Sequence, residues 1–171
     1  EYKKMNDSSN LCLSCGLCCD GTLIGFVQVD NEEIPALREL LDIEEVKEKG
    51  VFLQPCNKYC DGCTIYSQRP KQCASFKCGL LKSVEQKELD FDKAIEAISE
   101  VKQQKIALEK NLALLDFKLQ SQSFYFKMVE LKKILQKSKS ESGQRQKFQD
   151  LISDFEQFEN LLQSKFDLNF S

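Results

Sequence analysis

The pattern of hydrophobic and polar positions divides the chain into two kinds of sequence. Residues 22–29 (TLIGFVQV) alternate loosely and are rich in β-branched and aromatic side chains, which predicts one short strand. A helix is expected from about Glu32 through Leu41, and a second short helix within residues 42–50, with Gly50 as its stop. This first part therefore predicts a small scaffold with little β-structure.

From about Ser83 the hydrophobic period becomes helical. In a heptad register that starts at Phe91, ten of the fourteen a and d positions are apolar. The a positions are Phe91, Ile98, Lys105, Leu112, Leu119, Phe126 and Lys133, and the d positions are Ala94, Val101, Leu108, Leu115, Gln122, Val129 and Gln136. Since no proline or glycine interrupts residues 80–142, the pattern predicts one helix of about fifty residues. A break near residues 121–123 is the alternative.

A second helical seam follows a polar stretch. Residues 137–146 (KSKSESGQRQ) include a glycine and predict a turn. The apolar positions after it are Phe148, Leu151, Phe155, Phe158 and Leu162. The simplest product is a long antiparallel helical hairpin of coiled-coil type, so we expect a mainly α fold. Two interpretations stay open: the hairpin's apolar side chains pack only on one another, or the longer arm binds a second copy or a protein partner.

The composition indicates that any chemistry of this chain depends on its thiols. The 171 residues include nine cysteines and no histidine, which excludes Ser-His-Asp and Cys-His catalytic groups, HExxH zinc sites and facial-triad iron sites. All nine cysteines lie between Cys12 and Cys78. We therefore expect a cysteine-rich, metal-bound module over residues 5–82 and a helical extension over residues 83–171.

Charge and hydropathy argue against nucleic-acid and membrane partners. The net charge of −3, from 27 acidic and 24 basic side chains, lacks the basic footprint of nucleic-acid binding. No apolar run approaches the roughly 18 residues of a membrane span, and the N-terminus lacks the order of a secretory signal. The expected location is the cytoplasm.

The first cysteine cluster has the spacing of a metal-binding turn. Cys12, Cys15 and Cys18 follow one another at two-residue spacing, and Cys19 comes directly after. Two-residue spacing lets the chain wrap a metal, and Gly16 permits the tight turn. The first three cysteines match the opening of the bacterial ferredoxin run. A disulfide framework is disfavoured by the adjacent cysteines and by the missing secretory signal.

The second cluster adds five more thiols, at Cys56, Cys60, Cys63, Cys73 and Cys78. Four thiolates satisfy a tetrahedral zinc ion or a cubane cluster. Nine cysteines therefore allow two four-ligand sites with one thiol left over, or one site with structural thiols beside it.

Together the two clusters resemble a known family. The run from Cys12 to Cys19 and the segment Cys63-Thr64-Ile65-Tyr66-Ser67-Gln68-Arg69-Pro70-Lys71-Gln72-Cys73-Ala74-Ser75-Phe76-Lys77-Cys78 are similar to the zinc- or iron-chelating cysteine-cluster family. Its motif also occurs in flagellin lysine N-methylases, for which a 4Fe-4S cluster and methyl transfer are implied. The resemblance covers about residues 12–78 and leaves residues 83–171 outside.

The resemblance implies a ligand set. Carried over by position, the metal or cluster ligands are Cys12, Cys15, Cys18, Cys19, Cys56, Cys63, Cys73 and Cys78. Cys60 matches no motif position and is the expected spare thiol. Pro70 is expected to fix a turn, and Arg69 either neutralises thiolate charge, holds a carboxylate or phosphate, or pairs with a neighbouring helix. Tyr66 and Phe76 are expected in the module's core.

Two hypotheses about function follow. The first is an iron-sulfur protein whose 4Fe-4S centre serves redox chemistry, sensing or S-adenosylmethionine-linked chemistry. The second is a zinc-stapled structural or interaction module, in which the helical hairpin binds a partner or itself. Enzyme status stays undecided, because no catalytic base, nucleophile or glycine-rich cofactor loop is visible.

Overall fold

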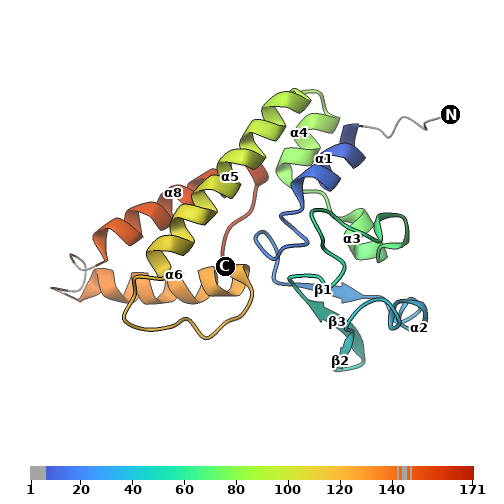
Figure 1. Ribbon diagram of the computed structural model, residues 1–171, viewed down its shortest axis with the longest axis horizontal. Coiled ribbons are helices and arrows are strands. Elements are labelled where there is room, and N and C mark those ends of the chain that lie inside the picture. The colour runs from blue at the N-terminus through green and yellow to red at the C-terminus, as the bar shows by residue number, and fades with distance from the viewer. Residues whose placement is uncertain (1–6, 142, 144–145, 147) are drawn as a thin grey trace. The chain divides into compact units, whose positions relative to one another are not determined.

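The chain divides into two compact units in the computed structural model (Figure 1). The structure describes residues 7–141, 143, 146 and 148–171. The first unit runs up to Lys77 and takes in Ser123–Tyr125, and the second holds Cys78–Gln122 and Phe126–Ser171. Within the described residues, no helix is both long and apolar enough to cross a membrane.

The first unit is built on a three-stranded antiparallel sheet. Its elements are α1 (Asp7–Cys15), β1 (Phe26–Val29), α2 (Ile34–Leu37), β2 (Glu44–Val46), β3 (Lys49–Leu53), the short 3₁₀ helix η1 (Tyr66–Gln68) and α3 (Lys71–Ser75). The strand order is β1-β3-β2. Alternate strand residues face a buried cluster, formed by Val27, Val29, Ile34, Leu37, Leu41 and Phe52. This cluster is the core on which the cysteine loops rest.

The region predicted as a second short helix is a β-hairpin. Residues 44–46 pair with residues 49–51, and Lys47 and Glu48 make the turn with φ of 49° and 65°. Gly50 sits opposite Val29, where a Cβ atom would lie 2.9 Å from Cδ1 of Ile34. The helix prediction was wrong because a segment this short takes its structure from long-range pairing rather than from its own helix propensity.

The neighbouring predictions were correct in kind but too long. The strand predicted over residues 22–29 begins at Phe26, and α2 covers only Ile34–Leu37 of the helix predicted through Leu41. Turn hydrogen bonds carry the chain on from α2, since the Leu41 N–H donates to the Leu37 carbonyl at 2.8 Å.

The second unit is helical. Its helices in the described residues are α4 (Gly79–Glu85), α5 (Phe91–Leu112), α6 (Phe124–Ser140), which begins within the first unit, and α8 (Gln149–Phe166). The predicted second seam is confirmed, because Phe148, Leu151, Phe155, Phe158 and Leu162 are all buried. Phe158 stacks on Phe170 with ring centroids 6.0 Å apart. Lys132 of α6 pairs with Glu159 of α8 at 2.8 Å.

The predicted continuous helix of about fifty residues is wrong. The chain leaves the helical path after Glu85, with Lys87 at φ 60°, and again between Leu112 and Phe124. Three long helices replace the two arms of the expected hairpin, because folding back covers the apolar seam that one extended helix would expose. α6 continues to Ser140, so the turn predicted from residue 137 starts later, and residues 142, 144, 145 and 147 lie outside the described residues.

Candidate metal centre

A backbone hydrogen bond joins the two cysteine clusters. The Cys56 N–H donates to the Cys19 carbonyl at 2.8 Å, and the Gln54 N–H donates to the Gly25 carbonyl at 2.9 Å. The loop that begins at Cys56 is thereby anchored beside the end of the first cluster. A second close approach involves Gly62, where a Cβ atom would lie 3.1 Å from the Leu13 carbonyl oxygen.

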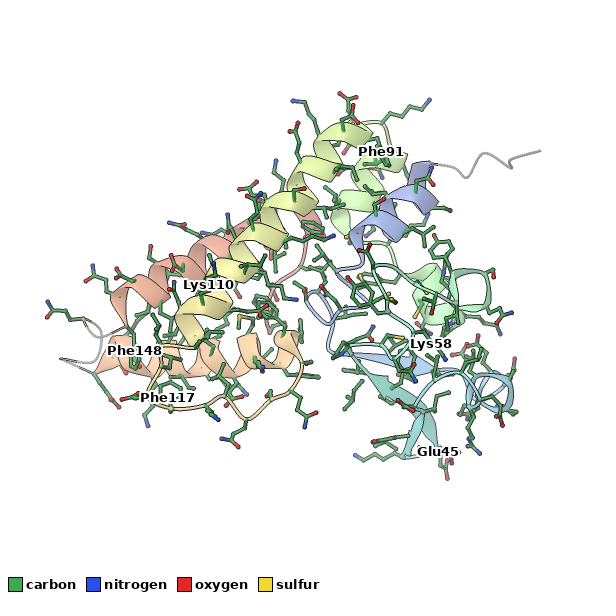
Figure 2. The ribbon with its side chains drawn as sticks, in the orientation of Figure 1. Glu45, Lys58, Phe91, Lys110, Phe117 and Phe148 are labelled. Atoms are coloured by element: carbon green, nitrogen blue, oxygen red, sulfur yellow. The ribbon has the colours of Figure 1, made fainter. Side chains whose placement is uncertain are left out.

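The loop from Cys56 to Cys63 turns backbone amides toward sulfur. The Lys58 N–H donates to Sγ of Cys56 at 3.4 Å, and the Ile65 N–H donates to the sulfur of Cys63 (Lys58 is labelled in Figure 2). Both donors come two residues after the cysteine they serve. Amides at this position hydrogen-bond metal-bound thiolates, and they disperse the negative charge on the sulfur.

Cys19 and Cys63 are in direct contact. The Cys19 S–H donates a hydrogen bond to the Cys63 sulfur, which lowers the pKa of the Cys63 thiol to about 6. The same bond, together with burial, raises the pKa of Cys19. These two cysteines lie 44 positions apart in the sequence, so the contact depends on the tertiary fold.

Cys56 and Cys73 complete a group of four thiols. Both pack against the hydrophobic core of the first unit. Burial raises the pKa of Cys56, and burial with the nearby charges of Cys56 and Cys63 raises the pKa of Cys73 to about 11. We call Cys19, Cys56, Cys63 and Cys73 the four-thiol group.

The other predicted ligands come from α1, from the turn that follows it and from the start of α4. Cys12 is an exposed residue of α1, Cys15 ends that helix, and Cys18 adjoins Cys19. Cys78 stands at the start of α4 in the second unit. Burial raises its pKa, opposed by the amides of Leu81 and Leu80, with no other cysteine among the causes. Cys60, the predicted spare thiol, is exposed.

The sulfurs do not form a closed metal site as they stand. Among the described residues, no three cysteine, aspartate or glutamate side chains converge closely enough to hold a metal ion. The donor chemistry nevertheless suits zinc or iron, because four soft thiols lie near one another with backbone N–H donors aimed at two of them. None of the nine cysteines, all of them described, is in a disulfide.

Arg69 lies beside the four-thiol group. Its guanidinium carbon sits 3.7 Å above the Tyr66 ring, and its charge acts to lower the pKa of both Cys63 and Cys73. Of the roles considered for Arg69, thiolate neutralisation is therefore the one its position supports. Tyr66 is half-buried. Phe76 is 37 % exposed, so the prediction that Phe76 lies in the core was wrong.

Glu33 supports the site and was not identified from the sequence. Its Oε1 accepts a hydrogen bond from the Lys71 N–H at 3.0 Å, at the start of the helix that carries Cys73. Nothing in the spacing of the motifs indicates this contact, because Glu33 precedes Lys71 by 38 residues. In the sequence, Glu33 looks like a carboxylate that serves only the helix in which it lies.

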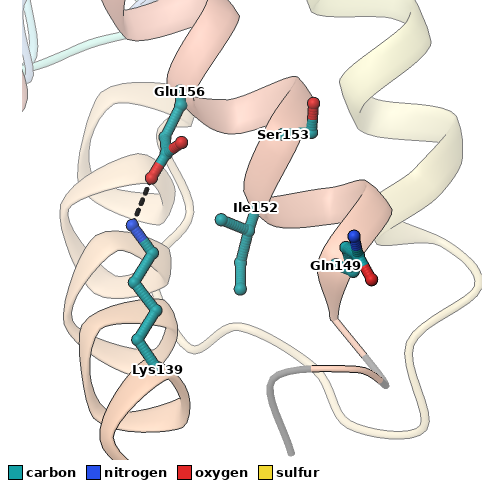
Figure 3. Close-up of a pocket in the computed structure, with 5 residues that line it drawn as sticks. All are labelled: Lys139, Gln149, Ile152, Ser153 and Glu156. Carbon is teal, nitrogen blue, oxygen red and sulfur yellow. Dashed lines mark hydrogen bonds and ion pairs between the residues drawn. The ribbon is translucent and has the colours of Figure 1, made fainter.

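A hollow in the second unit is a separate feature (Figure 3). Its volume is about 220 Å³, and it is lined by Lys139, Gln149, Ile152, Ser153 and Glu156. The Lys139 ammonium pairs with the Glu156 carboxylate across it. No cysteine lines the hollow, so it has no part in the candidate metal centre.

Comparison with known families is consistent with this site. Residues 11–110, more than half of the chain, match the family model CxxCxxCC, described as "Putative zinc- or iron-chelating domain". The match continues past Cys78 through α4 and most of α5, so the expectation that everything after residue 83 falls outside the family was wrong. No curated protein and no solved structure matches the chain.

Proposed function

The chain belongs to the CxxCxxCC family of zinc- or iron-chelating domains, and from that membership we propose that its cysteines hold a 4Fe-4S type iron-sulfur centre. The run of Cys12, Cys15 and Cys18 supports iron-sulfur chemistry, because its spacing matches the ferredoxin opening. The observation that carries metal binding itself is the four-thiol group, with amide donors aimed at two of its sulfurs.

We propose the ligands in two sets. The four-thiol group supplies the inner set, and Cys12, Cys15, Cys18 and Cys78 are the outer set. Metal binding requires the inner sulfurs to lie closer together than they do in this structure. The loops that carry them are short and rest on one core, which limits the movement that this closure requires. The bound iron-sulfur centre would supply electron transfer or Lewis acidity, and the chain positions and shields it.

A zinc-stapled module is the second candidate, and one contact favours it. Four sulfurs about 2.3 Å from a tetrahedral zinc ion lie about 3.8 Å from one another. The hydrogen bond between Cys19 and Cys63 brings two of the four sulfurs into direct contact, which favours such a short separation. A cubane cluster holds its ligand sulfurs farther apart. In this form the metal supplies folding free energy and no chemistry.

Anaerobic purification tests the proposal directly. An iron-sulfur protein is expected to be brown, with broad absorption near about 400 nm, and to contain iron and inorganic sulfide. A zinc module is expected to be colourless, with about one or two zinc ions per chain. A colourless, iron-free and zinc-containing product overturns the iron-sulfur form. A chain free of both metals after purification and after reconstitution overturns metal binding altogether.

The helical unit is our proposed site of self-association or partner binding. Ile106 on α5 and Leu114 after it are large apolar side chains that stay exposed, at 56 % and 83 %. Sedimentation velocity of the wild type and of the double variant Ile106→Ser, Leu114→Ser tests this assignment. A monomeric wild type over the accessible concentration range removes self-association. We also propose a cytoplasmic location, since thiolate ligands need the reduced cysteines that the cytosol maintains.

A further inference from the structure

Arg69 lies on the segment that joins two cysteines of the four-thiol group, Cys63 and Cys73. It follows η1 in an extended conformation, with φ −63° and ψ 153°, and Pro70 then leads into α3 and Cys73. The side chain folds back over the Tyr66 ring at 3.7 Å, and Nη1 donates to the Tyr66 carbonyl at 3.3 Å. Two contacts therefore fix the guanidinium on the short segment that joins Cys63 to Cys73.

One donor of this guanidinium is unused. Nε of Arg69 is buried and makes no hydrogen bond within the described part of the chain. Leaving a buried donor without an acceptor is costly, so such an atom usually has a partner in the functional state. No carboxylate of the described residues forms an ion pair with Arg69, in contrast to Arg38, which pairs with Glu45.

We propose that Arg69 is a positioning residue of the metal centre, whose charge offsets the anionic thiolates and whose Nε–H is reserved for a metal-bound sulfur. The inference rests on the proposed function and deepens it. Four thiolates around a divalent ion leave a net charge of −2, and a fixed guanidinium beside them lowers the cost of keeping that charge partly buried. Stacking on the Tyr66 ring keeps the Arg69 guanidinium from turning toward solvent.

The rate of metal release tests this role. Wild type, Arg69→Gln, Arg69→Lys and Arg38→Gln are loaded with zinc under reducing, anaerobic conditions and mixed with an excess of a chromophoric chelator. Arg69→Gln is expected to release zinc about tenfold faster than wild type, the size typical of lost outer-shell partners. Arg69→Lys, which keeps the charge but loses the Nε–H, is expected between the two. Arg38→Gln is the matched control, and its rate is expected to stay within about twofold of wild type.

Further measurements separate electrostatics from folding. The metal-free forms of wild type and Arg69→Gln are expected to differ in melting only by the small loss of the two Tyr66 contacts, and the metal-loaded forms by more, because the role of Arg69 depends on the filled centre. An equal difference in both forms overturns the proposal. If the bound group is an iron-sulfur cluster, Arg69→Gln is also expected to lower its midpoint potential, since a lost cation disfavours the reduced form. Should Arg69→Gln not fold, Arg69→Lys carries the test, and a wild-type release rate in that variant overturns the proposal.

The outcomes distinguish a failure of metal binding from a failure of the role given to Arg69. A wild type that binds neither zinc nor iron defeats the proposed function. A wild type that holds metal, with Arg69→Gln releasing it at the wild-type rate, defeats only the role of Arg69. An equally large acceleration in Arg38→Gln defeats it as well, because the effect would then follow from net charge alone.

Discussion

The ring of Tyr59 occupies the space that a side chain on Gly16 would need. A Cβ atom on Gly16 would lie 2.7 Å from Cε2 of Tyr59, and Gly16 has φ 66°. Gly16 belongs to the first cysteine run and Tyr59 to the loop between Cys56 and Cys63. The two clusters therefore meet at a point where the backbone and the Tyr59 ring together favour glycine.

Replacing Gly16 with alanine is expected to destabilise the first unit by about 2 kcal/mol or more, from the left-handed backbone and the clash with the Tyr59 ring together. Urea unfolding of the metal-free chain measures the loss. Gly143→Ala is the matched control, because Gly143 has φ 96° but nothing lies within 4 Å of the place that its Cβ atom would take. Equal losses in both variants would show that the ring contact contributes nothing.

Exchanging single thiols tests the ligand assignment. Cys63→Ser is expected to abolish metal retention, because it removes a sulfur that contacts Cys19 and receives a backbone N–H. Cys60→Ser is expected to retain the wild-type metal content, since Cys60 is exposed and matches no motif position. Metal analysis with thermal melting measures both. Metal loss in the Cys60 variant would mean that the ligands are wrongly allocated.

The outer ligand set needs its own variant. Cys15→Ser is expected to release the iron-sulfur centre if the ferredoxin-like run binds it, and to leave a single zinc ion in place if the four-thiol group acts alone. Iron, sulfide and zinc contents of this variant distinguish the two forms of the centre independently of colour.

Thiol reactivity in the metal-free chain is expected to follow the Cys19–Cys63 hydrogen bond. With its pKa lowered from 9.0 to about 6, Cys63 is largely thiolate at neutral pH, and its alkylation slows as the pH falls through about 6. Cys73, with a pKa raised to about 11, is expected to be alkylated more slowly than Cys63 at neutral pH. Peptide mapping after brief iodoacetamide treatment over a pH series gives both rates.

The control for this prediction removes the donor. Cys19→Ala is expected to move the Cys63 midpoint upward toward its ordinary value, because the bond from Cys19 is the largest cause of the shift. The stabilisation that the lowered pKa gives the metal-free fold is present at high pH and is lost as the pH falls through about 6. A Cys63 midpoint that is unchanged in Cys19→Ala contradicts the assigned hydrogen bond.

The helical unit depends on its aromatic core. Phe158 is fully buried and stacks on Phe170 at an interplanar angle of 10°, so Phe158→Ala is expected to cost about 3–5 kcal/mol. Leu114→Ala, at an exposed position, is expected to change the free energy of unfolding by less than about 0.5 kcal/mol. Circular dichroism during urea unfolding measures both. Similar small effects would place Phe158 outside the cooperative core.

Local sequence patterns predicted some features well. The run from Cys12 to Cys19, together with the segment from Cys63 to Cys78, was enough to identify the family, because metal-binding turns impose a local geometry. The seam from Phe148 to Leu162 was confirmed for a similar reason, since burial at helical spacing is a property of one element. Thiolate neutralisation was also among the roles expected for Arg69, and its charge acts to lower the pKa of Cys73.

Features that depend on distant residues could not be predicted in the same way. The heptad pattern runs through the break after Leu112, because apolar residues in a loop can be covered as well as those in a helix. Gly50 was expected to stop a helix, whereas its pairing with Val29 places it inside a strand. The contact between Cys19 and Cys63 joins loops whose approach depends on the sheet between them. No spacing rule contains that information.

A short piece of the helical sequence is structurally part of the cysteine half. The Tyr125 N–H donates to the Gly21 carbonyl at 2.8 Å, and Ser123–Tyr125 belong to the first unit. A gene fragment that stops shortly after the last cysteine would omit these three residues. The Gly21 carbonyl, near Cys19, would then lack the Tyr125 N–H as its donor. If the protein were expressed as two separate halves, the first unit would lack Ser123–Tyr125, which come from the later part of the chain.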